Sequence, residues 1–162
     1  MTLRDLTLAD ALAVCGDMRP EDAACVRAMT GQEPGEWYAV DRWRTSGPGW
    51  VLEQNGQPWA IGGLSMPLPW LGLLWMVARP GLTGESWRKV LRATRKVLAV
   101  ASDSKGPQYV HRIEVHVLSG WVGAERFAKR LGLLSLESVR RGCGANGEDV
   151  QVWAWVGPAK GA

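Results

Sequence analysis

Histidine, cysteine and phenylalanine are scarce in this chain. Its 162 residues include two histidines, three cysteines and one phenylalanine. Cys15, Cys25 and Cys143 form no closely spaced pair, so we expect neither a disulfide framework nor a metal site such as structural zinc. Scattered single thiols are typical of a reducing compartment. The net charge of +3 is also too small to indicate nucleic-acid binding by itself.

The chain also lacks a hydrophobic segment suited to a membrane. No charged residue stands between Glu53 and Arg79, and this stretch is long enough to cross a bilayer. It is interrupted, however, by Asn55-Gly56, by Gly62-Gly63 and by three prolines, which are typical of turns between short strands. The N-terminus carries acidic residues where a secretory signal peptide has a basic start. We therefore predict neither a membrane span nor a signal peptide.

Tryptophan is abundant where the other aromatic residues are rare. Ten tryptophans stand against one phenylalanine and two tyrosines. In one interpretation they fill core positions that phenylalanine and tyrosine usually occupy. In the other, some of them lie at an interface with a partner, where tryptophan is enriched. The sequence leaves both interpretations open.

Length and composition fit one globular domain over residues 1–162, with 158–162 as a short tail. Apolar residues make up 46% of the chain and charged residues 22%, which is typical of a folded protein with a sizeable core. The first third predicts a short strand at 2–6 and then three helices. The pair Thr7 and Asp10 fits the N-cap and third position of the first helix.

The second and third helices are predicted from prolines and apolar spacing. Pro20 suits the first turn of a helix, with Glu21 and Asp22 near the positive end of its dipole. Helical spacing predicts that its buried side contains Cys25, Ala28 and Met29. A third helix after Pro34 would bury a stripe made of Trp37, Val40 and either Trp43 or Arg44.

The rest of the chain alternates strands and helices. A hairpin is predicted around Asn55-Gly56, because both residues of a type I′ turn need positive φ. Residues 71–78 predict a strand that is buried on both faces, and 111–117 a half-buried strand. A final helix is predicted from the stripe Ala124, Phe127, Ala128 and Leu131, and a closing hairpin from 134–140 and 150–156. The fold class is therefore α/β, with a mixed, centrally parallel sheet and helices on both faces.

Residues 86–102 give the clearest helix, with one apolar and one basic face. The apolar face contains Trp87, Val90, Leu91, Thr94, Val97, Leu98 and Ala101. The basic face contains Arg88, Lys89, Arg92, Arg95 and Lys96. Five cations on one helix are able to contact phosphates, but a solvated helix face is the favoured interpretation and a nucleic-acid contact is not expected.

The order of these elements resembles the fold of GNAT acyl-CoA N-acyltransferases over nearly the whole chain. The segment Ala124–Leu133 is similar to the closing A-x-x-L-Y-x-K-x-G-F pattern of that family. The resemblance implies that a coenzyme A thioester wedges between two splayed parallel strands, here 71–78 and 111–117. Its acyl-pantetheine arm would then face the backbone around Trp75, Met76 and Val77. We expect Trp75, Trp87 or Trp121 to fill this gap if the gap is closed.

Two departures from the family pattern weaken the enzymatic interpretation. The family's phosphate-binding turn, Q/R-x-x-G-x-G/A, is matched by Arg79 and Gly84, whereas Gly81 is one position off and Pro80 removes an amide donor. The tyrosine that protonates the departing thiolate in many members aligns with Ala128, which has no proton to donate.

A substitute base would have to come from Glu114 or His116, which share one face of the predicted strand. The alternative is a polar strand face on which Arg112 and Glu114 form a surface pair. Strand alternation places His111 on the other face from His116, so the two do not form a ligand pair.

A second, narrower resemblance is to short phage-encoded GNAT-like proteins, including the internal or morphogenesis protein of T7-like podoviruses. It rests on the opening Arg4–Ala11 and on Met18–Asp22. It implies a structural or assembly role without acyltransferase chemistry, in the host cytoplasm during assembly or in the virion. The partners would be other virion proteins or further copies of the chain, and no cofactor would be needed. The alternative is an active N-acetyltransferase that uses acetyl-CoA on an unknown amine.

Overall fold

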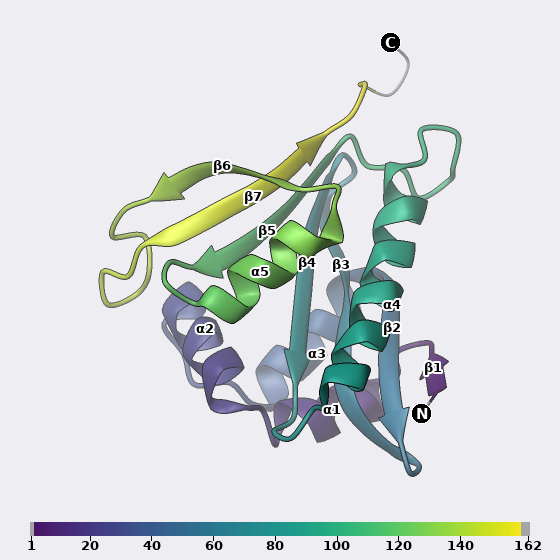
Figure 1. The fold of residues 1–162 in the computed structure, drawn as a ribbon, viewed down its shortest axis with the longest axis vertical. Coiled ribbons are helices and arrows are strands. Elements are labelled where there is room, and N and C mark those ends of the chain that lie inside the picture. Colours follow the sequence, from purple (N-terminus) through teal and green to yellow (C-terminus); the bar gives the residue numbers. More distant parts are fainter. Residues whose placement is uncertain (1, 160–162) are drawn as a thin grey trace.

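The computed structural model describes residues 2–159, so the last three residues of the predicted tail lie outside it (Figure 1). The strands and helices follow one another as β1 (Thr2–Arg4), α1 (Leu8–Cys15), α2 (Pro20–Thr30), α3 (Glu36–Thr45), β2 (Ser46–Gln54), β3 (Gln57–Leu68), β4 (Leu71–Ala78), α4 (Gly84–Ser102), β5 (Arg112–Leu118), α5 (Val122–Leu131), β6 (Ser135–Arg140) and β7 (Val150–Val156). The predicted order of elements is confirmed.

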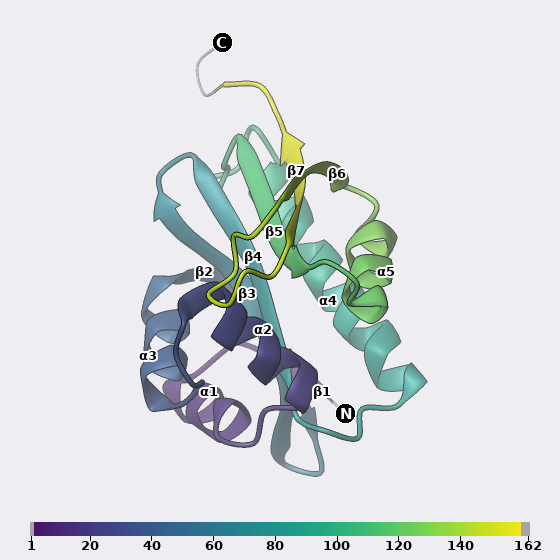
Figure 2. The same ribbon diagram turned by 90° about the vertical axis from the view of Figure 1, so that its left-hand side faces the viewer.

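Seven strands form a single mixed sheet in the order β1-β2-β3-β4-β5-β7-β6. Every neighbouring pair is antiparallel except β4 and β5, which run parallel at the centre. Figure 2 shows α1, α2 and α3 on one side of the sheet and α4 and α5 on the other. The α/β prediction with helices on both faces is therefore confirmed.

Each face of the sheet has its own apolar core. On one face, α4 packs on the sheet through a cluster that includes Trp50, Leu64 and Leu98. On the other, α1, α2 and α3 pack on a cluster that includes Val51, Ile61 and Trp75. Successive residues of a strand point to opposite faces, so neighbours such as Trp50 and Val51 serve different cores. The sheet is thus covered twice, as the apolar run of β4 indicated.

The start of α1 shows the predicted cap. The hydroxyl of Thr7 accepts a hydrogen bond from the Asp10 amide, and the Asp10 carboxylate accepts one from the Thr7 amide. Asp10 also binds both terminal nitrogens of Arg4 on β1, at 2.5 and 2.6 Å. The pKa of Asp10 lies below its ordinary value because the hydrogen bonds from Arg4 outweigh the effect of burial. This pair ties the first strand to the first helix.

The buried faces of α2 and α3 differ from the predicted ones. On α3, Trp37 and Trp43 are exposed, and the buried residues are Tyr38 and Ala39, so the predicted stripe was wrong by one position. On α2, the side chains of Cys25 and Met29 are only partly buried, whereas Asp22 is buried. Both helices border a large cavity, and the buried residues Asp22 and Tyr38 line it.

The Asn55-Gly56 turn joins β2 and β3 as predicted. Both residues have positive φ, 53° and 72°, as a type I′ turn requires. Farther along this hairpin, Gly62 faces the ring of Trp50, where a Cβ atom would lie 2.6 Å from the nearest ring carbon. Glycine is therefore needed at position 62 for the buried tryptophan to lie against the sheet.

The long helix α4 confirms the amphipathic prediction, with Val90, Thr94, Val97, Leu98 and Ala101 among its buried residues. Its basic residues have different contacts and do not form one free basic face. Lys89 pairs with Glu85, Arg95 donates a hydrogen bond to the Arg130 carbonyl, and Arg88 lines a cavity. None of the helices that the structure describes is long and apolar enough to cross a membrane.

Candidate active site

The two parallel strands separate after a short stretch of pairing. Residues Leu71 to Leu73 of β4 pair with Arg112 to Glu114 of β5, and no further pair follows between the two strands. Figure 1 shows the strands diverging from that point toward their C-terminal ends. The predicted splay between 71–78 and 111–117 is therefore present, and it is open rather than plugged.

The edge of β4 that faces this gap carries backbone groups without a strand partner. The amide and carbonyl of Ala78 point away from β3, because the amide bonds to Asp22 of α2 and the carbonyl accepts from the amide of Arg19, the N-cap of α2. The last pair, Leu73 with Glu114, uses the Leu74 amide, so strand alternation directs the carbonyl of Leu74 and the amide and carbonyl of Met76 into the gap. The side chains of Trp75 and Val77 belong to the core beneath α1–α3, and Met76 packs on the opposite core.

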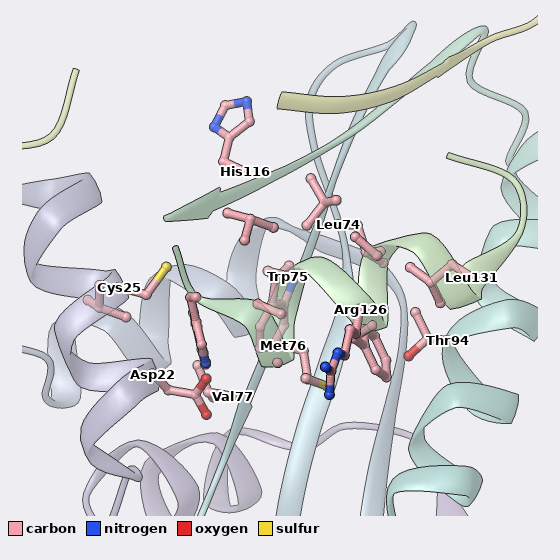
Figure 3. A pocket seen from close by; sticks show the side chains of 18 of the residues that line it. Asp22, Cys25, Leu74, Trp75, Met76, Val77, Thr94, His116, Arg126 and Leu131 are labelled. Carbon is pink, nitrogen blue, oxygen red and sulfur yellow. The ribbon is translucent and has the colours of Figure 1, made fainter. Parts of the chain in front are cut away.

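A cavity of about 820 Å³ occupies the gap and passes through the sheet. We call it the β4–β5 cleft; β4 and β5 line it, together with α2 and α3 on one face and α4 and α5 on the other. Figure 3 shows Asp22 and Cys25 of α2 at one side of the cleft and Thr94 and Leu131 at the other. Of the predicted cofactor-binding residues, four line the cleft: Trp75, Met76, Val77 and Gly84.

On the α2–α3 face, β5 presents a chain of charged side chains. His116 Nε2 lies 2.9 Å from Glu114 Oε2, and Arg112 Nε lies 2.5 Å from Glu114 Oε1. Arg112 also binds Glu137 of β6, at 2.6 Å. Both predicted base candidates, Glu114 and His116, line the cleft.

The predicted pair of Arg112 and Glu114 is present, but Glu114 is buried, so the expectation that the pair lies at the surface was wrong. Burial alone would raise the pKa of Glu114, but the hydrogen bonds from His116 and Arg112 outweigh it, and the pKa lies below its ordinary value. Glu114 therefore remains a carboxylate at neutral pH. It is suited to orient His116 rather than to accept a proton itself.

The α2 helix closes the wide end of the gap through two residues that the sequence analysis did not single out as functional. Asp22 accepts hydrogen bonds from Arg19 at 2.6 and 2.9 Å and from the Ala78 amide at 2.8 Å. The Arg19 guanidinium lies close to the rings of both Trp87 and Trp121. Burial raises the pKa of Asp22, although Arg19 opposes this effect. The only sequence signal is that Asp22 shares a helical stripe with Val26 and Met29.

The turn after β4 does not face the cleft as the resemblance implied. Arg79 pairs with Asp17 at 2.7 Å and stacks on Trp59. Arg79 and Gly81 line a separate pocket of about 250 Å³, and Arg19 and Trp87 form the wall between that pocket and the cleft. Of the three motif residues proposed from the sequence, Gly84 alone lines the cleft.

Ala128 lies buried in the cleft wall, at the position where the resemblance implies a tyrosine. A different tyrosine, Tyr38 of α3, lines the cleft from the opposite face. Burial raises the pKa of Tyr38 well above its ordinary value, so its hydroxyl stays protonated. Sequence reasoning missed Tyr38 because it assigned the buried side of α3 to the neighbouring tryptophan. Within residues 2–159, no cluster of side chains is suited to hold a metal ion.

The chain was compared with known proteins. No family model matches the sequence, and neither does any curated protein sequence. The structure, in contrast, is similar to solved acetyltransferases. A putative acetyltransferase from Salmonella typhimurium, solved with acetyl-CoA, matches with a TM-score of 0.67 and 14% identity over 99% of this chain and 96% of that one.

Two further solved structures give the same result. A ribosomal-protein-alanine N-acetyltransferase from Brucella melitensis matches with a TM-score of 0.70 and 13% identity, over 96% of this chain and 99% of that one. A GNAT-family acetyltransferase from Bacillus anthracis matches with a TM-score of 0.68 and 13% identity, over 95% and 93% of the two chains. The chain therefore has the GNAT fold. Because these identities are low, the likeness concerns the fold.

Proposed function

We propose that this chain is an acyl-CoA-dependent N-acyltransferase that acylates an amine in the β4–β5 cleft. The observation that carries the proposal is the separation of β4 from β5 around a cavity that connects both faces of the sheet. The free backbone edge at Leu74 and Met76 fits the amide groups of a pantetheine arm, because exposed strand edges bind extended amide chains. The similar structures are acetyltransferases, and one of them was solved with acetyl-CoA.

In the proposed mechanism, His116 acts as the general base. Its Nε2 is bound to the Glu114 carboxylate and carries the proton, so Nδ1 has a lone pair that can accept a proton from the attacking amine. Glu114 holds the ring in place and is itself held by Arg112. The acyl-CoA thioester supplies the acyl group: the amine nitrogen forms the new amide bond, and the carbon–sulfur bond breaks. Since Ala128 has no acidic proton, the departing thiolate takes its proton from solvent.

Calorimetry with acetyl-CoA and turnover with a panel of amines test this proposal. We expect acetyl-CoA to bind the wild type, and His116→Gln to lower kcat by about 100-fold or more with little change in acetyl-CoA affinity. His111→Gln is the matched control, because His111 lies outside the cleft lining. Absence of acetyl-CoA binding at millimolar concentration would refute the proposal.

A non-catalytic role is the second candidate function, and Ala128 is the observation that favours it. A phage virion or assembly protein would keep the GNAT fold without needing a thiolate acid or a phosphate-binding turn. Its partners would be other virion proteins in the host cytoplasm. Mass spectrometry of purified particles of the encoding phage tests this role. Presence of the chain in fixed stoichiometry, with no acetyl-CoA binding, would support it, whereas its absence from particles that assemble normally without it would contradict it.

A further inference from the structure

Three arginines line the side of the β4–β5 cleft that faces α4 and α5. Arg88 comes from α4, and Arg126 and Arg130 come from α5. All three are exposed, as are Gly84 and Gly123, which also belong to the lining. The cleft therefore opens to solvent between the two helices, at an opening that we call the α4–α5 mouth and define by these five residues.

None of the three arginines at this mouth is paired with an acidic residue of the described chain. Among the residues that the structure describes, Arg88, Arg126 and Arg130 form no ion pair, and their side chains donate no hydrogen bond. The nearby Glu85 pairs with Lys89, and Glu125 accepts hydrogen bonds from the Gly120 amide and from Gln151. The acidic residues of the cleft lining bind other arginines: Asp22 binds Arg19, and Glu114 binds Arg112. The mouth is thus suited to an anionic ligand group.

The turn that would bind phosphate in the family pattern is poorly placed for this task. Arg79 is held by Asp17, and the wall formed by Arg19 and Trp87 separates the pocket of Arg79 from the cleft. Leu82 stands two residues before Gly84, where the pattern has a glycine. At the first turn of α4, the Glu85 carboxylate adds negative charge beside the free amides. A ligand that enters the cleft at the mouth reaches the three arginines without contacting Arg79.

We propose that Arg88, Arg126 and Arg130 bind the phosphate groups of coenzyme A, in place of the turn Arg79–Gly84. This inference rests on the proposed acyl-CoA binding. Guanidinium groups bind phosphate oxygens through paired N–H donors, and their long side chains reach a mobile diphosphate without a tightly shaped backbone turn. Figure 3 shows Arg126 among the side chains that project into the cleft. The thioester end of the ligand would then extend between β4 and β5 toward His116.

The test compares two ligands and a set of matched variants by calorimetry. Acetyl-CoA carries the phosphate groups, and S-acetyl-pantetheine carries the same thioester arm without them. The triple variant Arg88→Gln, Arg126→Gln and Arg130→Gln should bind acetyl-CoA about 30-fold more weakly or worse, with unchanged affinity for S-acetyl-pantetheine. Acetyl-CoA affinity should fall with added salt in the wild type and less so in the triple variant, because salt screens exposed charges.

Two single variants complete the design. Arg92→Gln removes an exposed cation of α4 outside the cleft lining and should change the affinity less than twofold. Arg79→Gln tests the turn itself, and a larger loss from this variant than from the triple variant would overturn the inference. So would acetyl-CoA binding that the triple variant leaves intact, although the proposed function would survive both results. A wild type that binds neither ligand would overturn the proposed function and this inference with it.

Discussion

The guanidinium carbon of Arg19 lies 4.6 Å from the centre of the Trp87 ring. The same carbon lies 5.3 Å from the centre of the Trp121 ring. Arg19 is the N-cap of α2, and the two tryptophans lie at the starts of α4 and α5, so this one side chain joins elements from both faces of the sheet. The Asp22 carboxylate accepts hydrogen bonds from the Arg19 guanidinium, so Arg19 also takes part in a partly buried ion pair.

Removing Arg19 should destabilise the protein more than removing both members of the ion pair. Arg19→Met leaves the Asp22 carboxylate buried without its partner, which costs about 3 kcal/mol. Arg19→Met combined with Asp22→Asn removes both charges and should restore a large part of that loss. Urea unfolding of the wild type and the two variants measures this difference. Equal stability of the single and double variants would show that the carboxylate does not depend on Arg19.

Glu114 should make stability depend on pH in the acidic range. Its folded-state pKa lies below the ordinary value of 4.5, so the ionised form is favoured by folding. The resulting stabilisation is fully present above that ordinary value and is lost as the pH falls through the folded-state pKa. The difference in unfolding free energy between wild type and Glu114→Gln should therefore shrink on acidification from pH 7. A difference that stays constant with pH would contradict this assignment.

Gly62→Ala should destabilise the sheet, whereas Gly84→Ala should not. A Cβ at Gly62 would lie 2.6 and 2.9 Å from two ring carbons of the buried Trp50 and 3.0 Å from the Trp75 carbonyl oxygen. Because the ring cannot move without disturbing the core, we expect a loss of about 2 kcal/mol. A Cβ at Gly84 meets nothing within 4 Å, so this exposed position is the matched control. Thermal unfolding of both variants makes the comparison.

The three thiols should differ in their reaction with iodoacetamide. Burial raises the pKa of Cys15 to about 12 and that of Cys25 to about 11, so almost no thiolate forms at either residue at pH 8. Cys143 is exposed and should react first. Mass spectrometry after brief alkylation should therefore find one modified cysteine, and urea should expose the other two. Cys25 is only partly buried, so its slow reaction depends on the raised pKa of its thiol, and early modification of Cys25 would contradict that shift.

Elements with a strong local pattern could be predicted from the sequence. The spacing of apolar residues in α4, the cap of Thr7 and Asp10, and the Asn55-Gly56 turn are all short-range signals, and the structure confirms each. The splay between β4 and β5 was anticipated from the resemblance to a known fold. Glu114 and His116 were also found, because strand alternation places them on one face.

The residues that sequence reasoning missed depend on contacts between distant segments. The helix dipole alone explains an acidic residue such as Asp22 at the start of α2. Asp22 is nevertheless buried, because it accepts a hydrogen bond from the Ala78 amide of β4, 56 residues later. On α3, helical spacing was equally consistent with a tryptophan stripe and with Tyr38, and packing against the sheet favoured the tyrosine. The motif around Arg79 indicated a turn, but spacing carries no information on where that side chain points.

The amides of β4 should differ in how fast they exchange with solvent, because part of this strand's edge is free. The backbone groups of Trp75 and Val77 bond to β3, whereas the amide of Met76 opens onto the gap beyond the last β4–β5 pair. Deuterium should therefore replace the hydrogen of the Met76 amide far sooner than those of the Trp75 and Val77 amides. A strand at the middle of the sheet would then contain one fast-exchanging amide between two protected ones.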